Sequence, residues 1–253
     1  MEKKNSLGPG IVIGIPTLGR PVSLDWALAF KALNPPINFN VNFVLIKNSQ
    51  VADARNAIAK QAIEVKAKYL FFLGDDTIVP THALRQLLYR MENRQVDVVG
   101  GIYCAKCDPP APLVFMDNGT GSYWDWKLGE FFQCSGLGAD CLLLRTDIFT
   151  RLSEPWFKTI DTDQYIDGIN KAEQWTEDLY FFNKLNEELG IRPWADASVI
   201  CDHVDVYSGK TYQLPKDSLP LRQKLVLKDK RCLILGPPLE LNDESYDITV
   251  AGE

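Results

Sequence analysis

Short apolar runs alternate with amphipathic helical stretches through the first hundred residues, and this alternation limits the possible folds more than any other feature. Such alternation predicts right-handed crossovers and a mostly parallel central sheet with helices on both faces. The predicted strands are 11–15, 41–46, 69–73 and 96–101, and the predicted helices are 24–33, 52–66 and 80–93. The sequence therefore predicts an α/β fold.

The loops that follow the predicted strands are the expected place for a ligand. In open α/β sheets, ligands bind beyond the carboxyl ends of the strands. The first strand is expected to stop at Pro16, and the loops that begin at Pro16, Asn48 and Gly74 each follow such a strand. We therefore expect these three loops to share one edge of the sheet.

The second half of the chain does not continue the regular alternation of strands and helices. Proline- and glycine-rich stretches between 109 and 132 indicate turns and hairpins, and the polar, aromatic stretch 154–175 indicates a loop or lid. The other expected elements are a strand at 141–145, a helix at 176–189 and a strand at 197–201. We predict one catalytic domain over 8–207, with a nucleotide-binding half at 8–101, an acceptor half at 102–207 and a C-terminal extension at 208–253.

Composition excludes some classes of protein. The net charge of −6 argues against general nucleic-acid binding, which needs a basic face. The sequence contains neither an apolar run of eighteen residues nor a basic-then-apolar leader, so we expect no membrane span and a cytoplasmic location. Cys104 and Cys107 have the spacing of half a zinc site, although reduced thiols are the preferred interpretation.

Asp75 and Asp76 directly follow the predicted strand at 69–73. Two adjacent carboxylates repel each other unless a cation compensates them. Hard oxygen ligands suit Mg²⁺ or Mn²⁺, which can bridge the phosphates of a nucleotide. The alternative is a solvated turn that caps the next helix, because Asp is common in turns.

Other loops at the same predicted edge carry groups suited to phosphate. Arg55 and Asn56 lie in the first turn of a predicted helix, and Thr17 and Arg20 follow the first strand. An Arg can meet a phosphate or a base edge with its forked guanidinium. For Arg55 alone, a salt bridge to a neighbouring carboxylate is an equally good interpretation.

The sequence resembles the glycosyltransferases of the GT-A fold, especially the inverting members of family 2. The resemblance rests on Ile15-Pro-Thr17, on Ala54-Arg55-Asn56 and on the run from Phe71 through Gly74-Asp75-Asp76 to Pro80. It also includes Ser135-Gly-Leu-Gly-Ala-Asp140 and Thr176-Glu177-Asp178, and it spans roughly 11–203. The sequence departs from the family at Gly74, where the family has the first Asp of its Asp-x-Asp motif.

The resemblance implies a role for each matching residue. Asp76 and His203 would bind the metal, and Asp75 would contact either the metal or the ribose. Asp178 would be the catalytic base, supported or replaced by Glu177. The implied donor-binding residues are Pro16, Thr17, Arg20, Arg55, Asn56, Asp75, Gly138, Ala139 and Asp140. Glu177 and Asp178 also have a structural interpretation, because acids stabilise the first turn of a helix.

The function predicted from these residues is metal-dependent transfer of a sugar from a nucleotide-sugar donor to an acceptor hydroxyl, with inversion and with Mn²⁺ or Mg²⁺ as cofactor. The alternatives are a catalytically weak nucleotide-sugar-binding module and a nucleotidyltransferase. The loop 14–20 has few glycines, which disfavours the nucleotidyltransferase. A glycan, a lipid, a protein and a modified nucleobase all stay open as acceptor.

Overall fold

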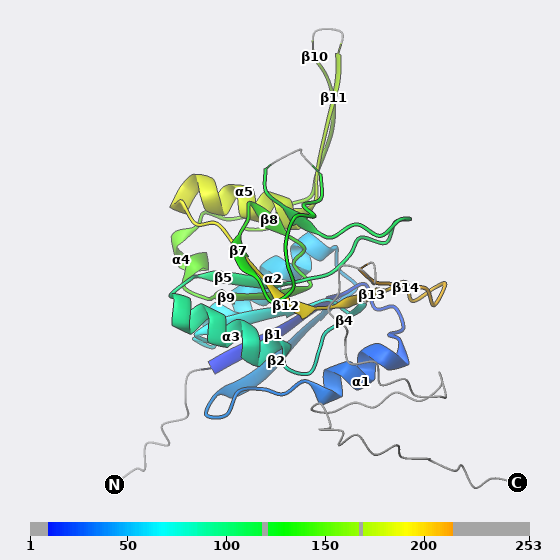
Figure 1. The fold of residues 1–253 in the computed structure, drawn as a ribbon. Helices are drawn as coiled ribbons and strands as arrows, with labels where there is room; N and C mark the ends of the chain where they lie inside the picture. Colours follow the sequence, from blue (N-terminus) through cyan, green and yellow to red (C-terminus); the bar gives the residue numbers. More distant parts are fainter. Residues whose placement is uncertain (1–9, 118–120, 167–168, 215–253) are drawn as a thin grey trace, which may run out of the picture.

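A seven-stranded sheet lies at the centre of the protein in the computed structural model, which describes residues 10–117, 121–166 and 169–214 (Figure 1). The strand order across the sheet is β2-β1-β3-β9-β5-β12-β7. The bounds are β2 Asn40–Lys47, β1 Gly10–Thr17, β3 Tyr69–Leu73, β9 Cys141–Arg145, β5 Val98–Ile102, β12 Trp194–Ile200 and β7 Phe131–Gln133.

Most strands of this sheet run in one direction, as predicted. β1 pairs in parallel with β2 and β3, and β12 pairs in parallel with β5. β9 lies between β3 and β5 and is antiparallel to both, and β7 is antiparallel to β12 at one edge. Consequently the carboxyl ends of β1, β3, β5 and β12 all face the same edge of the sheet.

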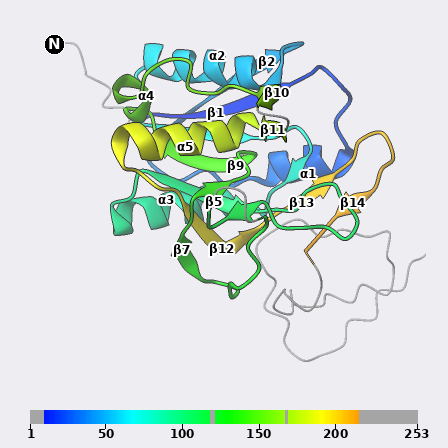
Figure 2. The ribbon, with the colours of Figure 1, turned by 90° about the horizontal axis from the view of Figure 1, so that it is seen from above.

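Helices cover both faces of the sheet. Helices α2 (Val51–Glu64), α4 (Ile148–Arg151) and α5 (Glu177–Leu189) contribute to the core on one face, and α1 (Leu24–Ala32) and α3 (Ala83–Arg94) contribute to the core on the other. Figure 2 shows α2 and α3 on opposite sides of the strands.

Strand β3 explains why both faces are covered. Its five residues are all buried, with Tyr69, Phe71 and Leu73 in one core and Leu70 and Phe72 in the other. Successive side chains of a strand point to opposite faces, so a continuous apolar run needs a packed layer on each side.

A small sheet beside the carboxyl edge brings distant parts of the chain together. Its strands are β4 (Thr77–Ile78), β13 (Asp202–Val204) and β14 (Thr211–Tyr212), in the order β14-β13-β4. In the antiparallel pairing of β13 with β4, His203 lies opposite Thr77. His203 is therefore held beside the turn that ends β3. A second short ribbon pairs β6 (Val114–Phe115) with β8 (Gly136–Leu137).

Two expectations about local structure are wrong. Strand β1 does not stop at Pro16 but continues to Thr17. Pro16 lies opposite Ile46 of β2, whereas the pairing of β1 with β3 ends at Gly14. The missing N–H of Pro16 therefore interrupts no hydrogen bond between β1 and β3.

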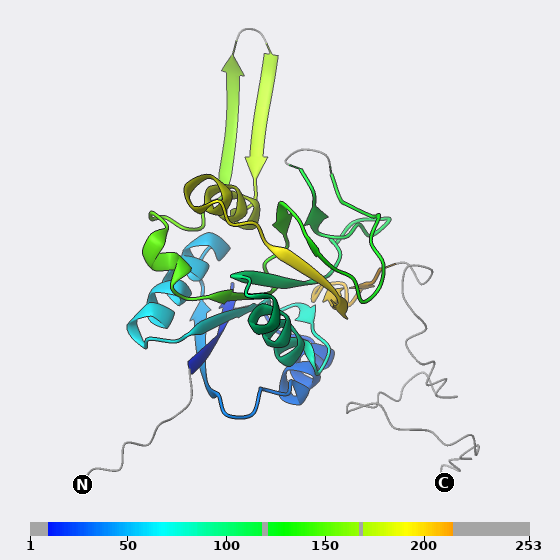
Figure 3. The same cartoon turned by 60° about the vertical axis from the view of Figure 1, so that its left-hand side comes forward.

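The stretch 154–175 is also not an irregular loop. Residues Ile160–Ile166 (β10) and Ile169–Trp175 (β11) form an antiparallel hairpin that projects away from the sheet next to α5 (Figure 3). Backbone pairing across a hairpin needs no apolar periodicity, which explains why the sequence pattern did not indicate it.

No helix in the described residues is both long enough and apolar enough to cross a bilayer. The predicted C-terminal extension at 208–253 lies outside the described residues after Leu214, and so does Cys232.

Candidate functional site

The turn after β3 places Asp75 next to the end of β1. Thr17 Oγ1 donates a hydrogen bond to Asp75 Oδ2 over 2.5 Å, and Arg20 Nη2 donates to Asp75 Oδ1 over 2.7 Å. β1 and β3 are parallel neighbours, so the loops that follow them meet at one edge. The structure thus brings Thr17, Arg20 and Asp75 together at the predicted edge of the sheet.

Asp76 is buried among cationic groups. Its Oδ2 accepts hydrogen bonds from Arg20 Nη2 and Lys106 Nζ, and its Oδ1 lies 3.4 Å from His203 Nε2. Burial raises the pKa of Asp76, but the hydrogen bonds and charges of His203 and Lys106 outweigh burial and hold this pKa well below its usual range. Asp76 is therefore a carboxylate at neutral pH.

His203 is oriented by the backbone of residue 104. Its Nδ1 lies 2.7 Å from the carbonyl oxygen of Cys104, which can only accept, so Nδ1 carries the proton. With its Nδ1 held by this carbonyl, the ring presents Nε2 to Asp76 Oδ1, and Nε2 is the atom through which the imidazole can bind a metal cation. Tyr103 packs edge-on against the imidazole, with ring centroids 5.2 Å apart.

Asp140 supplies a second carboxylate to the same place. It follows β8 in the chain, and its backbone carbonyl accepts a hydrogen bond from Gly74 N over 3.0 Å. One ligand atom each from Asp76, Asp140 and His203 lie within 4.8 Å of one another. We refer to these three residues as the Asp–Asp–His group.

The Asp–Asp–His group fits Mg²⁺ or Mn²⁺. Ligands on one octahedral Mg²⁺, with bonds of about 2.1 Å, lie about 3–4 Å apart, so a contraction of about 1 Å would complete the site. Two hard carboxylate oxygens with one imidazole nitrogen suit Mn²⁺ well. The described part of the chain can therefore hold the predicted cofactor.

Gly74 has a steric reason to lack a side chain. A Cβ built on Gly74 would lie 2.5 Å from Asp140 Cγ, which is far inside van der Waals contact. The carboxylate of Asp140 occupies the space that a side chain at position 74 would need. An acid from another segment therefore takes up the space beside position 74.

Arg55 is buried and points into the protein. Its exposed fraction is 2%, its Nη2 donates to Asp140 Oδ1 over 2.6 Å, and its Nη1 donates to the carbonyl of Ala139 over 2.8 Å. Nε lies 3.4 Å from Glu177 Oε1. Burial lowers the pKa of Arg55, but Asp140 and Glu177 outweigh it and raise the pKa above its usual value. Arg55 thus links two acids of the site.

Asn56 lies outside this cluster. Its Nδ2 donates to the carbonyl of Phe157 over 2.8 Å, and its Oδ1 accepts from the backbone N–H groups of Trp156 and Phe157. These bonds join α2 to the segment that precedes the β10–β11 hairpin. The structure gives Asn56 a backbone-holding role and does not bring it to the Asp–Asp–His group.

Glu177 and Asp178 form the first turn of α5. Asp178 Oδ1 accepts hydrogen bonds from Thr176 Oγ1 and from the backbone N–H of Leu179. Burial and the neighbouring Glu177 raise the pKa of Asp178 to about 6. A carboxylate with this pKa is ionised at neutral pH and holds a proton better than an ordinary Asp.

Three predicted donor-binding residues are buried parts of the framework. Pro16 lies within β1, and Ala139 offers its carbonyl to Arg55. Gly138 lies against Tyr103, because a Cβ there would be 2.3 Å from the phenol oxygen. Gly138 and Ala139 therefore shape the segment that carries Asp140.

Lys106 contacts Asp76 of the Asp–Asp–His group, and the sequence did not predict this contact. It lies in Cys104-Ala-Lys106-Cys107, where the cysteine spacing matches half a zinc site but a single lysine has no recognisable pattern. The two cysteines that flank Lys106 have no metal-binding role within the described ranges of the chain. Burial raises the pKa of Cys104 to about 12, which keeps its thiol protonated. Cys107 Sγ donates to the carbonyl of Pro109 over 3.2 Å. Neither thiol joins a metal-competent group among the described residues.

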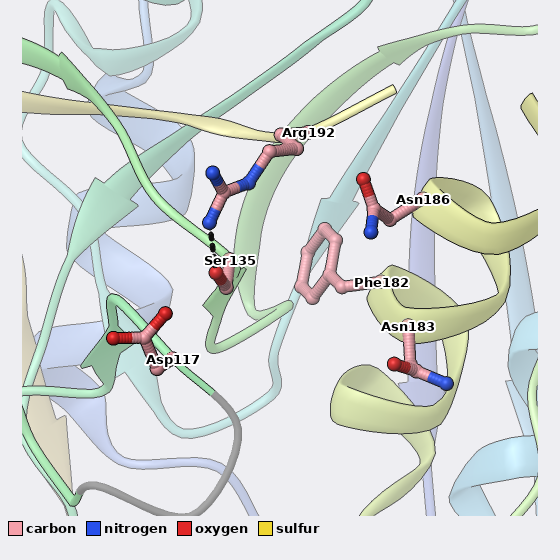
Figure 4. A pocket seen from close by; sticks show the side chains of 6 residues that line it. All are labelled: Asp117, Ser135, Phe182, Asn183, Asn186 and Arg192. Atoms are coloured by element: carbon pink, nitrogen blue, oxygen red, sulfur yellow. Dashed lines mark hydrogen bonds between the residues drawn. The ribbon is translucent and has the colours of Figure 1, made fainter. Parts of the chain in front are cut away.

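A polar cavity of about 320 Å³ lies along α5 (Figure 4), and its lining includes no residue of the Asp–Asp–His group. Arg192 reaches into it and donates a hydrogen bond to Ser135 Oγ. Its lining residues are Asp117, Ser135, Phe182, Asn183, Asn186 and Arg192. Asn186 lies eight residues, or about 12 Å, along the helix from Asp178.

The sequence matches no protein-family model and no curated protein. Among solved structures, the chain is similar to A197 from STIV, with 18% identity and a TM-score of 0.57 over 85% of this chain and 99% of A197. It is also similar to S. aureus TarS 1–349 in complex with UDP-GlcNAc, with 14% identity and a TM-score of 0.44 over 75% of this chain and 56% of TarS 1–349. For TarS 1–349 in complex with UDP, the identity is 13% and the TM-score 0.45, over 74% of this chain and 58% of the other.

The chain thus spans less than two thirds of TarS 1–349 and nearly all of A197. The likeness to A197 concerns the fold. The predicted α/β fold is confirmed: the central sheet is mostly parallel, helices cover both of its faces, and the fold is similar to that of A197.

Proposed function

We propose that the protein is a metal-dependent glycosyltransferase that moves a sugar from a nucleotide-sugar donor to an acceptor hydroxyl with inversion. The observation that carries the proposal is the Asp–Asp–His group, in which two carboxylates and an imidazole from three separate segments lie within 4.8 Å of one another. Two carboxylate oxygens and an imidazole nitrogen are ligands that suit Mn²⁺, so this arrangement favours a cation-binding role.

Asp76, Asp140 and His203 would hold Mn²⁺ or Mg²⁺, and when bound the cation neutralises charge on the diphosphate leaving group. The guanidinium of Arg20, at the same edge, suits a phosphate oxygen. Thr17 and Arg20 hold Asp75 in place, and Asp75 in this position suits a ribose hydroxyl or the cation.

Asp178 would act as the base. In the proposed step, the acceptor oxygen forms a bond to the anomeric carbon, the bond from that carbon to the diphosphate oxygen breaks, and the hydroxyl proton passes to Asp178. A raised pKa of about 6 suits this role, because the carboxylate is ionised at pH 7 and is a stronger base than an ordinary Asp. Direct displacement inverts the anomeric configuration, which NMR of the product would reveal.

The test is release of nucleoside diphosphate from a panel of nucleotide sugars with Mn²⁺, in the wild type and in Asp76→Asn. We expect metal-dependent release in the wild type and a loss of about 10³-fold in the variant. Asp25→Asn is the matched control, because Asp25 is an exposed acid in the first turn of α1. Binding of donor without release would instead favour the nucleotide-sugar-binding module, and release that resists EDTA would contradict the metal site.

A further inference from the structure

Lys106 lies in a short loop whose base is fixed. The loop leaves the sheet after β5 and returns through a bridge between Cys104 and Pro112. Ala105 N donates to the carbonyl of Ala111 over 2.8 Å. The carbonyl of Cys104 also accepts from His203 Nδ1. The backbone that carries Lys106 is therefore tied to the imidazole of the Asp–Asp–His group, while the side chain itself is 25% exposed.

Lys106 and Arg20 both bind the same oxygen, Oδ2 of Asp76. They differ in how they are held. Arg20 also contacts Asp75 through two nitrogens, at 2.7 and 3.4 Å. Within the residues that the structure describes, the ion pair of Lys106 is with Asp76. Lys106 is therefore the cation that can leave Asp76 with the smaller change in the surrounding contacts.

A divalent cation on Asp76 would conflict with this position of Lys106. Such a cation lies about 2.0–2.2 Å from a carboxylate oxygen, which places two positive charges next to the ammonium group. Like charges at that separation repel strongly in a partly buried site. The ammonium would have to move by about the width of the cation, and a flexible four-carbon stem allows this.

Once displaced from Asp76, the ammonium group of Lys106 would find its nearest anion in the diphosphate bound to the same cation. We propose that Lys106 is a diphosphate-binding residue that neutralises Asp76 in the nucleotide-free protein and transfers to a phosphate oxygen when metal and nucleotide bind. The inference rests on the proposed function and adds to it a cationic residue that the family resemblance did not supply. A purely structural Lys106 would stay on Asp76 in every state.

The experiment compares the wild type with Lys106→Met and Lys106→Arg. Mn²⁺ binding to the nucleotide-free protein is measured by electron paramagnetic resonance. Binding of UDP, GDP, ADP, CDP and dTDP is measured by calorimetry with saturating Mn²⁺. Lys210→Met is the matched control: Lys210 is 49% exposed and pairs with Asp108 at 3.7 Å, so this variant removes the same charge outside the Asp–Asp–His group.

We expect Lys106→Met to bind Mn²⁺ about 10-fold more tightly and the preferred nucleoside diphosphate about 10- to 100-fold more weakly, since a charge-assisted hydrogen bond is lost. Lys106→Arg should keep most of the nucleotide affinity, and Lys210→Met should change neither quantity. Because Asp76 keeps Arg20 and His203 as partners, Lys106→Met should melt close to the wild type.

Changes in opposite directions are the signature, because a structural defect would weaken both kinds of binding. If the wild type binds metal and nucleotide but Lys106→Met leaves both affinities unchanged, or weakens both, the inference is overturned and the proposed function stands. If the wild type binds neither Mn²⁺ nor any of the five nucleotides, the proposed function fails and the inference fails with it.

Discussion

Asp178→Asn should make the protein more stable while it slows transfer. The pKa of Asp178 is raised from 3.8 to about 6 by burial and by Glu177. At neutral pH the folded protein therefore holds a carboxylate in a place that disfavours its charge. Each unit of pKa shift corresponds to about 1.4 kcal/mol, so the charge costs at most about 3 kcal/mol. Asp178 is only half-buried, which lowers the expected gain to about 1–2 kcal/mol.

The side-chain amide in Asp178→Asn keeps an oxygen that can accept from Thr176 and Leu179, so the substitution removes the charge and little else. For a protein of this size, 1 kcal/mol shifts Tm by about 2–4 °C, and we expect a rise of about 2–8 °C at pH 7.5. Transfer should fall by about 10²- to 10⁴-fold, the usual contribution of a general base.

The pH dependence of the stability gain tests its cause. The folded-state pKa is raised, so the contribution of this carboxyl group to stability is fully present below the unfolded-state pKa of about 4 and is lost as the pH rises through about 6. The advantage of Asp178→Asn should be complete above pH 6 and should vanish near pH 4, as measured by urea denaturation across this range.

Glu187→Gln is the control, because Glu187 is an exposed acid on the same helix and its loss should change stability by less than about 0.5 kcal/mol. A variant at position 178 that gains no stability at pH 7.5, or gains the same amount at pH 4, would refute the argument from burial. Full transfer activity in that variant would refute the assignment of the base.

Three further predictions concern the framework of the site. Arg55→Met should lower the free energy of unfolding by about 2–4 kcal/mol, since it leaves the half-buried acids Asp140 and Glu177 without their cationic partner. An unchanged urea midpoint would contradict the ion pair with Asp140. Gly74→Ala should lower the free energy of unfolding by about 1–3 kcal/mol and weaken Mn²⁺ binding, because the added Cβ would displace Asp140. A normal Mn²⁺ affinity in calorimetry would exclude this steric effect. Asn56→Ala should lower Tm because its hydrogen bonds to Phe157 are lost, while the donor affinity of the folded protein stays within about 2-fold of the wild type. A large loss of donor affinity without a drop in Tm would instead indicate that Asn56 binds the donor directly.

The sequence determined the parts of the protein that depend on local patterns. The apolar run 69–73 had to be a strand buried on both faces, since every residue in it is apolar and successive side chains alternate between the faces. The alternation of strands with helices predicts parallel neighbours, and this places Thr17 and Asp75 at one edge of the sheet, where the structure has them in contact.

Tertiary structure alone decided which groups complete the site. Asp140 fills the space above Gly74, and Lys106 reaches Asp76, because of strand pairings between segments far apart in the chain. The insertion of β9 between β3 and β5 is one such pairing. Local periodicity carries no information about these contacts, since the partner of a buried acid is set by how the chain folds back on itself. The fold likewise places Asn56 against the backbone of Phe157, to which it hydrogen-bonds, although Ala54-Arg55-Asn56 resembles a donor-binding motif.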